Sequence, residues 1–246
     1  MRIIFLGTAA AVASEKRDNT ALLIDDILVD CPGNAFGKML KAGYDPLKLR
    51  AIFITHRHVD HSYGLPSLLE MLRLSGKKGI KIYINEDFLF EAKQMLNNYE
   101  LIRDDFALEL VAVPNDGYVA FEGSLRFETF PVKHSVPNFG LKISSSNSSV
   151  VYSSDTEPCE SIVEKAKGVD LLVHEATCAK TITGSKEGHS CVEDVAKIAK
   201  EAKVKSLCLV HLGAELEEHL DEFKSKVKEI FDGMLIVPED LDRAIV

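Results

Sequence analysis

The stretch "FITHRHVDHSYG", residues 53–64, gathers three histidines and an aspartate within six positions. The apolar run "AIFIT" before it predicts a buried strand, and "GLPSLLEMLRLSG" after it has the leucine spacing of a helix. The cluster therefore begins in a loop, where His56 and His58 point the same way. Asp60 and His61 belong to the following turn and helix start, so they aim at a different spot. These side chains suit divalent cations such as Zn²⁺ at two positions. Surface histidines at a helix start are the alternative.

Other polar side chains also follow apolar strands. "LRFETFPVKH" delivers His134, "FGLKISSSNSSVVYSSDT" reads as a hairpin with Asp155 just beyond it, and "KSLCLVHLG" ends in His211. Each residue taken singly is more often an ordinary polar residue at a strand end. Residues at strand ends of one sheet edge can converge although they are far apart in sequence, and a rigid scaffold then holds function on its loops. The joint pattern predicts that these residues meet His56.

The rest of the chain alternates short apolar strands with helices, and neither a repeat nor a linker divides it. We therefore expect one α/β domain over residues 1–246. Strands are expected at "RIIFLG", "ALLID", "ILVDCPG", "IKIYI", "VDLLVHEA" and "MLIV", and helices at "NAFGKMLKAG", "EDFLFEAKQMLNNY", "CVEDVAKIAKEAK" and "ELEEHLDEFKSKVKEIF".

Composition excludes some classes of protein. Hydrophobic residues at 46% and charged residues at 27% are ordinary globular usage. A net charge of −9 argues against a surface that binds nucleic acid throughout, although "RLSGKKGIK" forms a local basic cluster that reads equally as a solvated loop. Apolar runs stay short of the roughly 18 residues that a membrane helix needs, so no membrane association is expected.

The N-terminal segment and the cysteines indicate the cellular compartment in which the protein is expected. "MRIIFLGTAAAVASEK" imitates a signal peptide, but its basic region is Arg2 alone and the segment is short, so a buried first strand is preferred. Five cysteines form no CxxC pair, and an odd number leaves no complete pairing. We expect buried reduced thiols and a cytoplasmic protein.

"THRHVDH" resembles the signature of the metallo-β-lactamase superfamily. Further stretches are similar to its tRNase Z branch, also called zinc phosphodiesterase: "PVKHSVPNFG", "SSDT", "LLVHEATC", "EGHSCVEDVAKIA" and the N-terminal "LGTAAAV" and "KRDNTALLI". The similarity covers nearly the whole chain. It implies an α/β fold, the αββα sandwich, with two mixed β-sheets flanked by helices and the metals at one edge between them.

The resemblance also implies a set of seven metal ligands. Two Zn²⁺ ions are expected, with Mn²⁺ or Fe²⁺ as alternative occupants, and a water between them activated for attack. One metal would be held by His56, His58 and His134, the other by Asp60, His61 and His211, and Asp155 would bridge them. Asp60 could in addition orient that water or accept its proton.

His189 and Glu175 match the pair that this family places at the leaving group. A leaving alkoxide needs a proton, and a carboxylate partner raises the pKa of a histidine and fixes its tautomer. The alternatives are that His189 caps the helix after Ser190 and that Glu175 is a satisfied strand-end carboxylate. Of the two other histidines, His174 is expected in the core and His219 in solvent.

Two further residues precede the second expected strand. Arg17 and Asn19 are expected either to structure the N-terminal loop over the site or to touch substrate phosphate.

The expected reaction is hydrolysis of a phosphodiester, either RNA or a small nucleotide. Branch members that cut tRNA usually carry a long Gly/Pro-rich arm, which residues 77–131 lack, and "HLGAEL" lacks the arginine that often follows the last ligand. Two substrates therefore compete: the 3′ end of tRNA, and small cyclic or linear nucleotides or cyclic phosphates. A third hypothesis is an inactive metal-binding regulatory protein. Branch members often dimerise, and "LPSLLEMLRL" offers either a homodimer face or a core helix.

Overall fold

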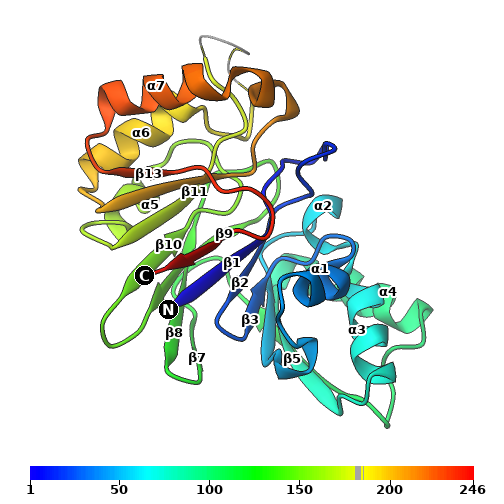
Figure 1. Ribbon diagram of the computed structural model, residues 1–246. Helices are drawn as coiled ribbons and strands as arrows, with labels where there is room; N and C mark the ends of the chain where they lie inside the picture. The colour runs from blue at the N-terminus through cyan, green and yellow to red at the C-terminus, as the bar shows by residue number, and fades with distance from the viewer. Residues whose placement is uncertain (181–183, 185) are drawn as a thin grey trace.

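The structure, a computed structural model, describes residues 1–180, 184 and 186–246. Within these residues, fourteen strands form two mixed seven-stranded sheets that pack face to face, with helices outside both (Figure 1). This is the αββα sandwich expected from the sequence. Of the described helices, none is long and apolar enough to cross a lipid bilayer.

The first sheet has the strand order β14-β1-β2-β3-β4-β5-β6. Strands β14, β1, β2 and β3 are antiparallel neighbours, and β3 to β6 run parallel. Parallel strands are covered on both faces, which explains why "AIFI" of β4 is apolar throughout and fully buried. The bounds are β1 Arg2–Gly7, β2 Ala21–Ile24, β3 Ile27–Val29, β4 Ala51–Ile54, β5 Gly79–Asn85, β6 Ala107–Val113 and β14 Arg243–Ile245.

The second sheet has the order β13-β12-β11-β10-β9-β8-β7. Strands β7 to β10 are antiparallel neighbours, and β10 to β13 run parallel. The predicted hairpin is β9–β10. The bounds are β7 Val119–Glu122, β8 Leu125–Pro131, β9 Phe139–Ser144, β10 Ser149–Tyr152, β11 Leu171–Glu175, β12 Ser206–Val210 and β13 Met234–Ile236.

The helices divide between the two outer faces. Helices α1, α3 and α4 cover the first sheet and α5, α6 and α7 the second (Figure 1). The leucines of α3 (Leu65, Leu68, Leu69 and Leu72) are buried against the sheet. The bounds are α1 Ala35–Lys41, α2 Val59–Ser62, α3 Leu65–Leu74, α4 Leu89–Asn98, α5 Glu160–Lys165, α6 Val192–Glu201 and α7 Leu220–Ile230, with 3₁₀ turns at Pro46–Lys48, Glu86–Phe88 and Ala214–His219.

An aromatic stack joins the two sheets. The Phe53 ring of β4 lies 4.4 Å from the Tyr83 ring of β5 and 4.8 Å from the Phe127 ring of β8. Phe53 and Phe127 are buried completely, so each contributes its full apolar area to the core between the sheets. This core fixes the first sheet against the second and thereby brings strand ends from both sheets to one edge.

The expected strand "MLIV" contains β13, but β13 is not the last strand of the structure. The chain continues to β14, which pairs antiparallel with β1, and the Met1 amino group donates to the Val246 carbonyl at 3.0 Å. The sequence analysis also left out β6, β7 and α5. Strand β6, "ALELVAV", is mostly half-exposed and has no turn residue directly before it, so its pattern is weak.

The expectation of unpaired cysteines is wrong for two of the five. Cys178 and Cys191 form a disulfide, whereas Cys31, Cys159 and Cys208 are free thiols. A parallel bridge between the segments after β11 and before α6 brings the two Cα atoms to 4.3 Å. That proximity is tertiary, and a spacing of 13 residues in the sequence could not reveal it. Cys31 and Cys208 are buried as expected, and burial raises the pKa of both thiols.

Candidate metal centre and catalytic pair

All seven predicted ligands lie together at one edge of the sandwich. Strands β8, β10 and β12 run in one direction within the second sheet, so the residues after them reach the same edge. Strand β4 of the first sheet ends opposite them and leads into the loop of "THRHVDH". The convergence predicted from the strand ends is therefore present.

Two clusters share one aspartate. His56, His58, His134 and Asp155 form the first, and Asp60, His61, Asp155 and His211 form the second; within each, the candidate ligand atoms lie within 4.8 Å of one another. In the second cluster, Asp155 Oδ2 lies 3.3 Å from His61 Nε2 and 3.2 Å from His211 Nε2. In the first, it lies 3.9 Å from His56 Nε2 and 4.0 Å from His134 Nε2. The carboxylate of Asp155 thus faces both clusters.

The donor atoms fit a pair of dications. Among the described residues, five buried side-chain polar atoms have no hydrogen-bond partner, which is rare for such atoms. Four belong to the clusters, His56 Nε2, His61 Nε2, His211 Nε2 and Asp155 Oδ1, and the fifth is His174 Nε2. Ligands about 2.0–2.2 Å from a tetrahedral Zn²⁺ lie about 3.3 Å from one another. The 3.2–3.5 Å separations in the second cluster match that edge length.

Asp30 and Thr55, which the sequence analysis missed, orient two of the histidines. Asp30 Oδ2 lies 2.8 Å from His61 Nδ1, and Thr55 Oγ1 lies 3.0 Å from His56 Nδ1. Thr55 in turn donates to Asp30, at 3.0 Å. Such contacts to the second ring nitrogen leave the first nitrogen directed at the metal position. Asp30 directly follows β3, so the same strand-end signal that found His56 could have found it.

Charge and burial shift the pKa values of the clustered side chains in different directions. Burial, with His61 nearby, lowers the pKa of His56 well below its usual value. Burial likewise lowers the pKa of His134, and both shifts favour the neutral ring, the form in which an imidazole can bind a metal. Burial alone would also lower the pKa of His61, but the carboxylates of Asp155 and Asp30 outweigh it and raise that pKa. Burial opposes the charge on Asp155, yet His211 and His61 hold its pKa well below the usual range.

Backbone strain marks the same edge. Asp30, Ser154 and His211 have φ angles of +61°, +53° and +54°, a region in which residues other than glycine are uncommon. Each follows a strand that ends at the site. Buried hydrogen bonds hold two of these side chains: Ser154 donates to Thr55 at 3.0 Å, and Asp30 accepts from the Thr55 backbone at 2.9 Å. Strain of this kind persists where the surroundings fix the conformation, and it is enriched at functional sites.

His189 and Glu175 form a pair beside both clusters. Their Nδ1 and Oε1 atoms are 2.8 Å apart. The His189 ring lies 5.1 Å from the His134 ring and 5.4 Å from the His211 ring, so it neighbours one histidine of each cluster. Burial lowers the pKa of His189, but the hydrogen bond and charge of Glu175 raise it above the usual value. The alternative in which His189 caps a helix is not seen, because α6 begins at Val192 with Cys191 at its N-cap.

The remaining polar candidates have structural roles. Arg17 is buried and its guanidinium donates to Thr8 Oγ1 and the Pro238 carbonyl, while Asn19 donates to the Ala10 carbonyl. Both therefore structure the N-terminal loop. As expected, His174 is buried, with its Nδ1 2.7 Å from the Glu175 carbonyl oxygen, and His219 is exposed.

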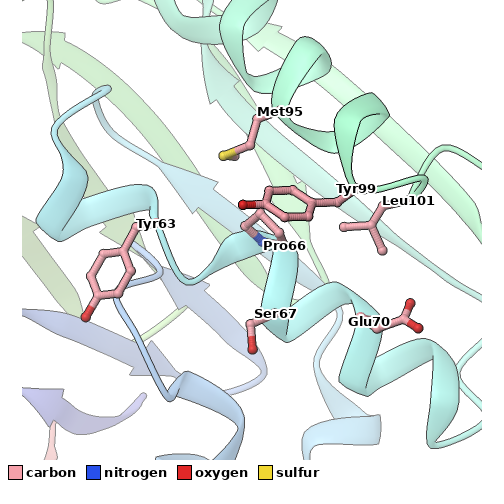
Figure 2. A pocket seen from close by; sticks show the side chains of 7 residues that line it. All are labelled: Tyr63, Pro66, Ser67, Glu70, Met95, Tyr99 and Leu101. Atoms are coloured by element: carbon pink, nitrogen blue, oxygen red, sulfur yellow. The ribbon is translucent and has the colours of Figure 1, made fainter.

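Two hollows lie near these residues. One, of about 200 Å³, has His189, His211 and Thr177 on one side and the Ala10–Val12 loop on the other, with Lys186 also in its lining. The other, of about 520 Å³, lies between α3 and α4, with Tyr99 and Met95 facing Pro66 (Figure 2). Tyr63 contributes to this second hollow from the turn after α2. His189 lines the first hollow but Glu175 does not, and the second hollow is lined by residues of α3 and α4 and of the turns after α2 and α4.

Comparisons with known proteins agree with this geometry. The family described as "Anti-Pycsar protein Apyc1" matches residues 1–230. Ribonuclease Z of Ignicoccus hospitalis is 27% identical over 304 aligned positions, covering 100% of this chain and 98% of the relative. The metallo-β-lactamase fold protein YhfI from Bacillus subtilis superposes with a TM-score of 0.84 at 21% identity, covering 99% and 98% of the two chains. The short form of human tRNase Z gives a TM-score of 0.81 at 23% identity, covering 100% and 99%.

These matches extend over almost the whole chain and span the positions of the two clusters and of His189 and Glu175. The protein is a metal-dependent hydrolase with the metallo-β-lactamase fold and the sequence features of the tRNase Z-like branch, and it belongs to the Anti-Pycsar protein Apyc1 family.

Proposed function

We propose that the chain is a dinuclear zinc phosphodiesterase of the tRNase Z-like type. In this proposal the seven clustered residues are the ligands: His56, His58 and His134 at one ion, Asp60, His61 and His211 at the other, and Asp155 between them. The observation that carries it is the position of His189 next to His134 and His211, one histidine from each cluster. A proton donor placed there serves a bond cleaved between two metals.

Two bound zinc ions would supply an activated water at neutral pH and stabilise negative charge on the phosphate oxygens. The protein's own groups do the rest. Asp60, whose carboxylate lies 3.5 Å from His61 Nε2 and from His211 Nε2, orients the water or accepts its proton. His189 donates a proton to the leaving oxygen, and Glu175 engages Nδ1 so that Nε2 remains for that oxygen. The side chain of His189 is 22% exposed, which allows substrate to reach it.

Two substrate classes follow from different observations. Relatives called ribonuclease Z favour the 3′ end of tRNA. Residues 77–131, all of which the structure describes, instead fold into β5, α4, β6, β7 and β8, which leaves no arm to grip a large RNA. Together with the net charge of −9, this favours a small cyclic or linear nucleotide as the second candidate.

The reaction class is tested with His189→Ala. Zinc-loaded protein is expected to hydrolyse bis(p-nitrophenyl) phosphate, and a chelator should abolish this. For an unactivated phosphodiester, whose leaving alkoxide needs a proton, His189→Ala should lower kcat by about 10²–10⁴-fold. His219→Ala, at an exposed histidine that belongs to neither cluster, is the control and should keep wild-type turnover. Metal-loaded protein without turnover of any phosphodiester would favour the inactive regulatory hypothesis.

The substrate classes are separated by parallel assays of unprocessed tRNA and of cyclic mononucleotides. Binding and cleavage of tRNA at low salt support the first class, and turnover of cyclic nucleotides without tRNA binding supports the second. Mass spectrometry of the purified protein identifies the metal, with zinc expected and manganese or iron as the alternatives.

Two further expectations concern the oligomeric state and the cellular location of the protein. We propose a homodimer, because Met71 and Leu74 of α3 are exposed apolar residues, as is Tyr99, which lines the hollow of Figure 2. Light scattering of the purified protein measures its mass. The cytoplasmic location stays a prediction, and the Cys178–Cys191 disulfide gives it no support.

A further inference from the structure

We propose that Thr177 is a positioning residue that joins the metal ligand His211 to the catalytic pair through its hydroxyl group. The inference rests on the proposed function. Thr177 lies two residues beyond the end of β11 and is buried. Its Oγ1 atom lies 2.8 Å from Glu175 Oε2 and 3.0 Å from His211 Nδ1. The Thr177 hydroxyl therefore contacts both a candidate metal ligand, His211, and one member of the catalytic pair, Glu175.

The direction of the two hydrogen bonds of the Thr177 hydroxyl follows from which of its partners can donate a proton. An ionised carboxylate only accepts, so the single hydroxyl proton of Thr177 goes to Glu175 Oε2. His211 Nε2 is one of the unpartnered buried atoms aimed at the metal position, and a neutral ring that binds metal there carries its proton on Nδ1. His211 Nδ1–H then donates to Thr177 Oγ1. The His211 carbonyl and His189 Nδ1 are both 3.3 Å from Oγ1 and are the weaker contacts.

Glu175 completes the chain of hydrogen bonds. Its Oε2 atom accepts from the Thr177 hydroxyl and from the Thr177 backbone N–H at 3.0 Å. Its Oε1 atom accepts from His189 Nδ1 and from the Thr156 backbone N–H at 3.0 Å. Four donors thus hold a carboxylate that is 1% exposed. The order His211–Thr177–Glu175–His189 links the orientation of a ligand ring to that of the proton donor.

A second His–Thr–carboxylate chain in the same site supplies a matched control. Thr55 lies 3.0 Å from His56 Nδ1 and donates to Asp30 at 3.0 Å. Asp30 also contacts His61, a second ligand, whereas Glu175 contacts His189. Loss of either threonine hydroxyl removes the acceptor of a ligand's Nδ1–H. Only the loss of Thr177 also removes a donor from the carboxylate that holds the proton donor.

The test compares Thr177→Val, Thr177→Ser and Thr55→Val with the wild-type protein. Zinc affinity is measured on metal-free protein by competition with a chromophoric chelator, and a thermal melt verifies that each variant folds. Thr177→Val and Thr55→Val should each weaken zinc binding by about 10–100-fold, the usual effect of removing such a contact. Thr177→Ser retains the hydroxyl and should bind zinc like the wild type. Wild-type affinity in Thr177→Val, or no rescue by serine, overturns the proposal.

A second measurement isolates the link to His189. At saturating zinc, turnover of a p-nitrophenyl phosphodiester is compared with that of a dinucleotide, because only the dinucleotide's alkoxide needs a proton to leave. Thr177→Val should slow cleavage of the dinucleotide about tenfold more than cleavage of the p-nitrophenyl ester. Thr55→Val should leave the ratio of these two rates at the wild-type value. An unchanged ratio in Thr177→Val contradicts the link. If the wild-type protein cleaves neither ester, the proposed function fails, and zinc affinity alone then decides the role of Thr177.

Discussion

At the residue scale, Glu175 sets the protonation of His189. Burial favours the neutral ring, and the adjacent carboxylate reverses this by stabilising the imidazolium, which raises the pKa of His189. A general acid works while it carries its proton, so activity should fall as the pH rises through this raised pKa. In the proposed mechanism, the buried carboxylate of Glu175 therefore moves the alkaline limit of activity to higher pH.

Glu175→Gln should move the alkaline limb of the kcat profile to lower pH. With the charge removed, burial is unopposed and the pKa of His189 falls, so at pH 7 kcat for an unactivated phosphodiester should drop by about tenfold or more. The measurement is kcat against pH for saturating substrate and zinc. Glu187→Gln, an exposed neighbour of His189 in sequence, is the control and should leave the limb in place. An alkaline limb that moves upward in Glu175→Gln would contradict the assignment of His189 as the acid.

Also at the residue scale, sequence patterns identified the ligands better than the residues that orient them. Histidines and aspartates at strand ends form a distinctive combination, so all seven ligand candidates could be predicted. Asp30 is a single carboxylate after a short strand, and Thr177 is one of many threonines. Their roles come from the hydrogen bonds that they make, which depend on neighbours distant in the sequence.

At the scale of elements, the disulfide closes the segment that carries His189. The Thr177 N–H donates to the Ser190 carbonyl at 3.1 Å and the Val192 N–H to the Cys178 carbonyl at 2.7 Å, so backbone hydrogen bonds already join the two ends. The disulfide between Cys178 and Cys191 adds a covalent constraint between these same two segments. The disulfide therefore acts mainly by reducing the conformational entropy of the unfolded chain, because the folded segments are already held together by hydrogen bonds.

Reduction of this disulfide should lower the free energy of unfolding by about 3 kcal/mol, the effect expected for a closed loop of about 15 residues. The measurement is a urea denaturation curve with and without a dithiol reductant. A thiol titration in denaturant gives an independent result: the three free cysteines should react before reduction and all five after it. Five reactive thiols before reduction would show that the pair is not bonded.

The elements most visible in the sequence are those with a strong period. The leucines of α3 repeat at helical spacing and are all buried, and β4 is an uninterrupted apolar run. Strands β7 and β14 are short sheet edges with exposed residues, so their local sequence carries little signal. Their pairing, β7 with β8 and β14 with β1, is decided by neighbours rather than by their own residues.

At the scale of the whole molecule, the candidate metal centre is built from residues of both sheets. Four candidate ligands, His56, His58, Asp60 and His61, come from the loop after β4 of the first sheet and from α2, and the other three follow strands of the second sheet. Metal binding should therefore couple the sheets. An ion that binds only the folded protein stabilises it, by about 4 kcal/mol when the free ion is at 1,000 times its Kd.

Removal of metal by a chelator should lower the melting temperature by about 10 °C, given the usual 2–4 °C per kcal/mol for a chain of this size. Differential scanning calorimetry with and without the chelator measures this, and added zinc should restore the original value. The double variant His56→Ala/His211→Ala, which lacks one ligand of each ion, should not respond to zinc or chelator. A wild-type melting temperature independent of zinc would contradict the dinuclear site.

The sequence by itself predicted one α/β domain and the strand-end histidines and carboxylates, because periodicity and the grouping of these residues are local properties of the chain. The αββα sandwich and the pair His189 and Glu175 were predicted from the resemblance to the tRNase Z branch. Only the tertiary structure decided the order of the two sheets, the pairing of Cys178 with Cys191 and the hydrogen-bond chains through Thr55 and Thr177. These depend on which segments pack against one another. The physical reason is that a hydrogen bond or a disulfide needs two groups within a few ångströms, and the core between the sheets sets those distances.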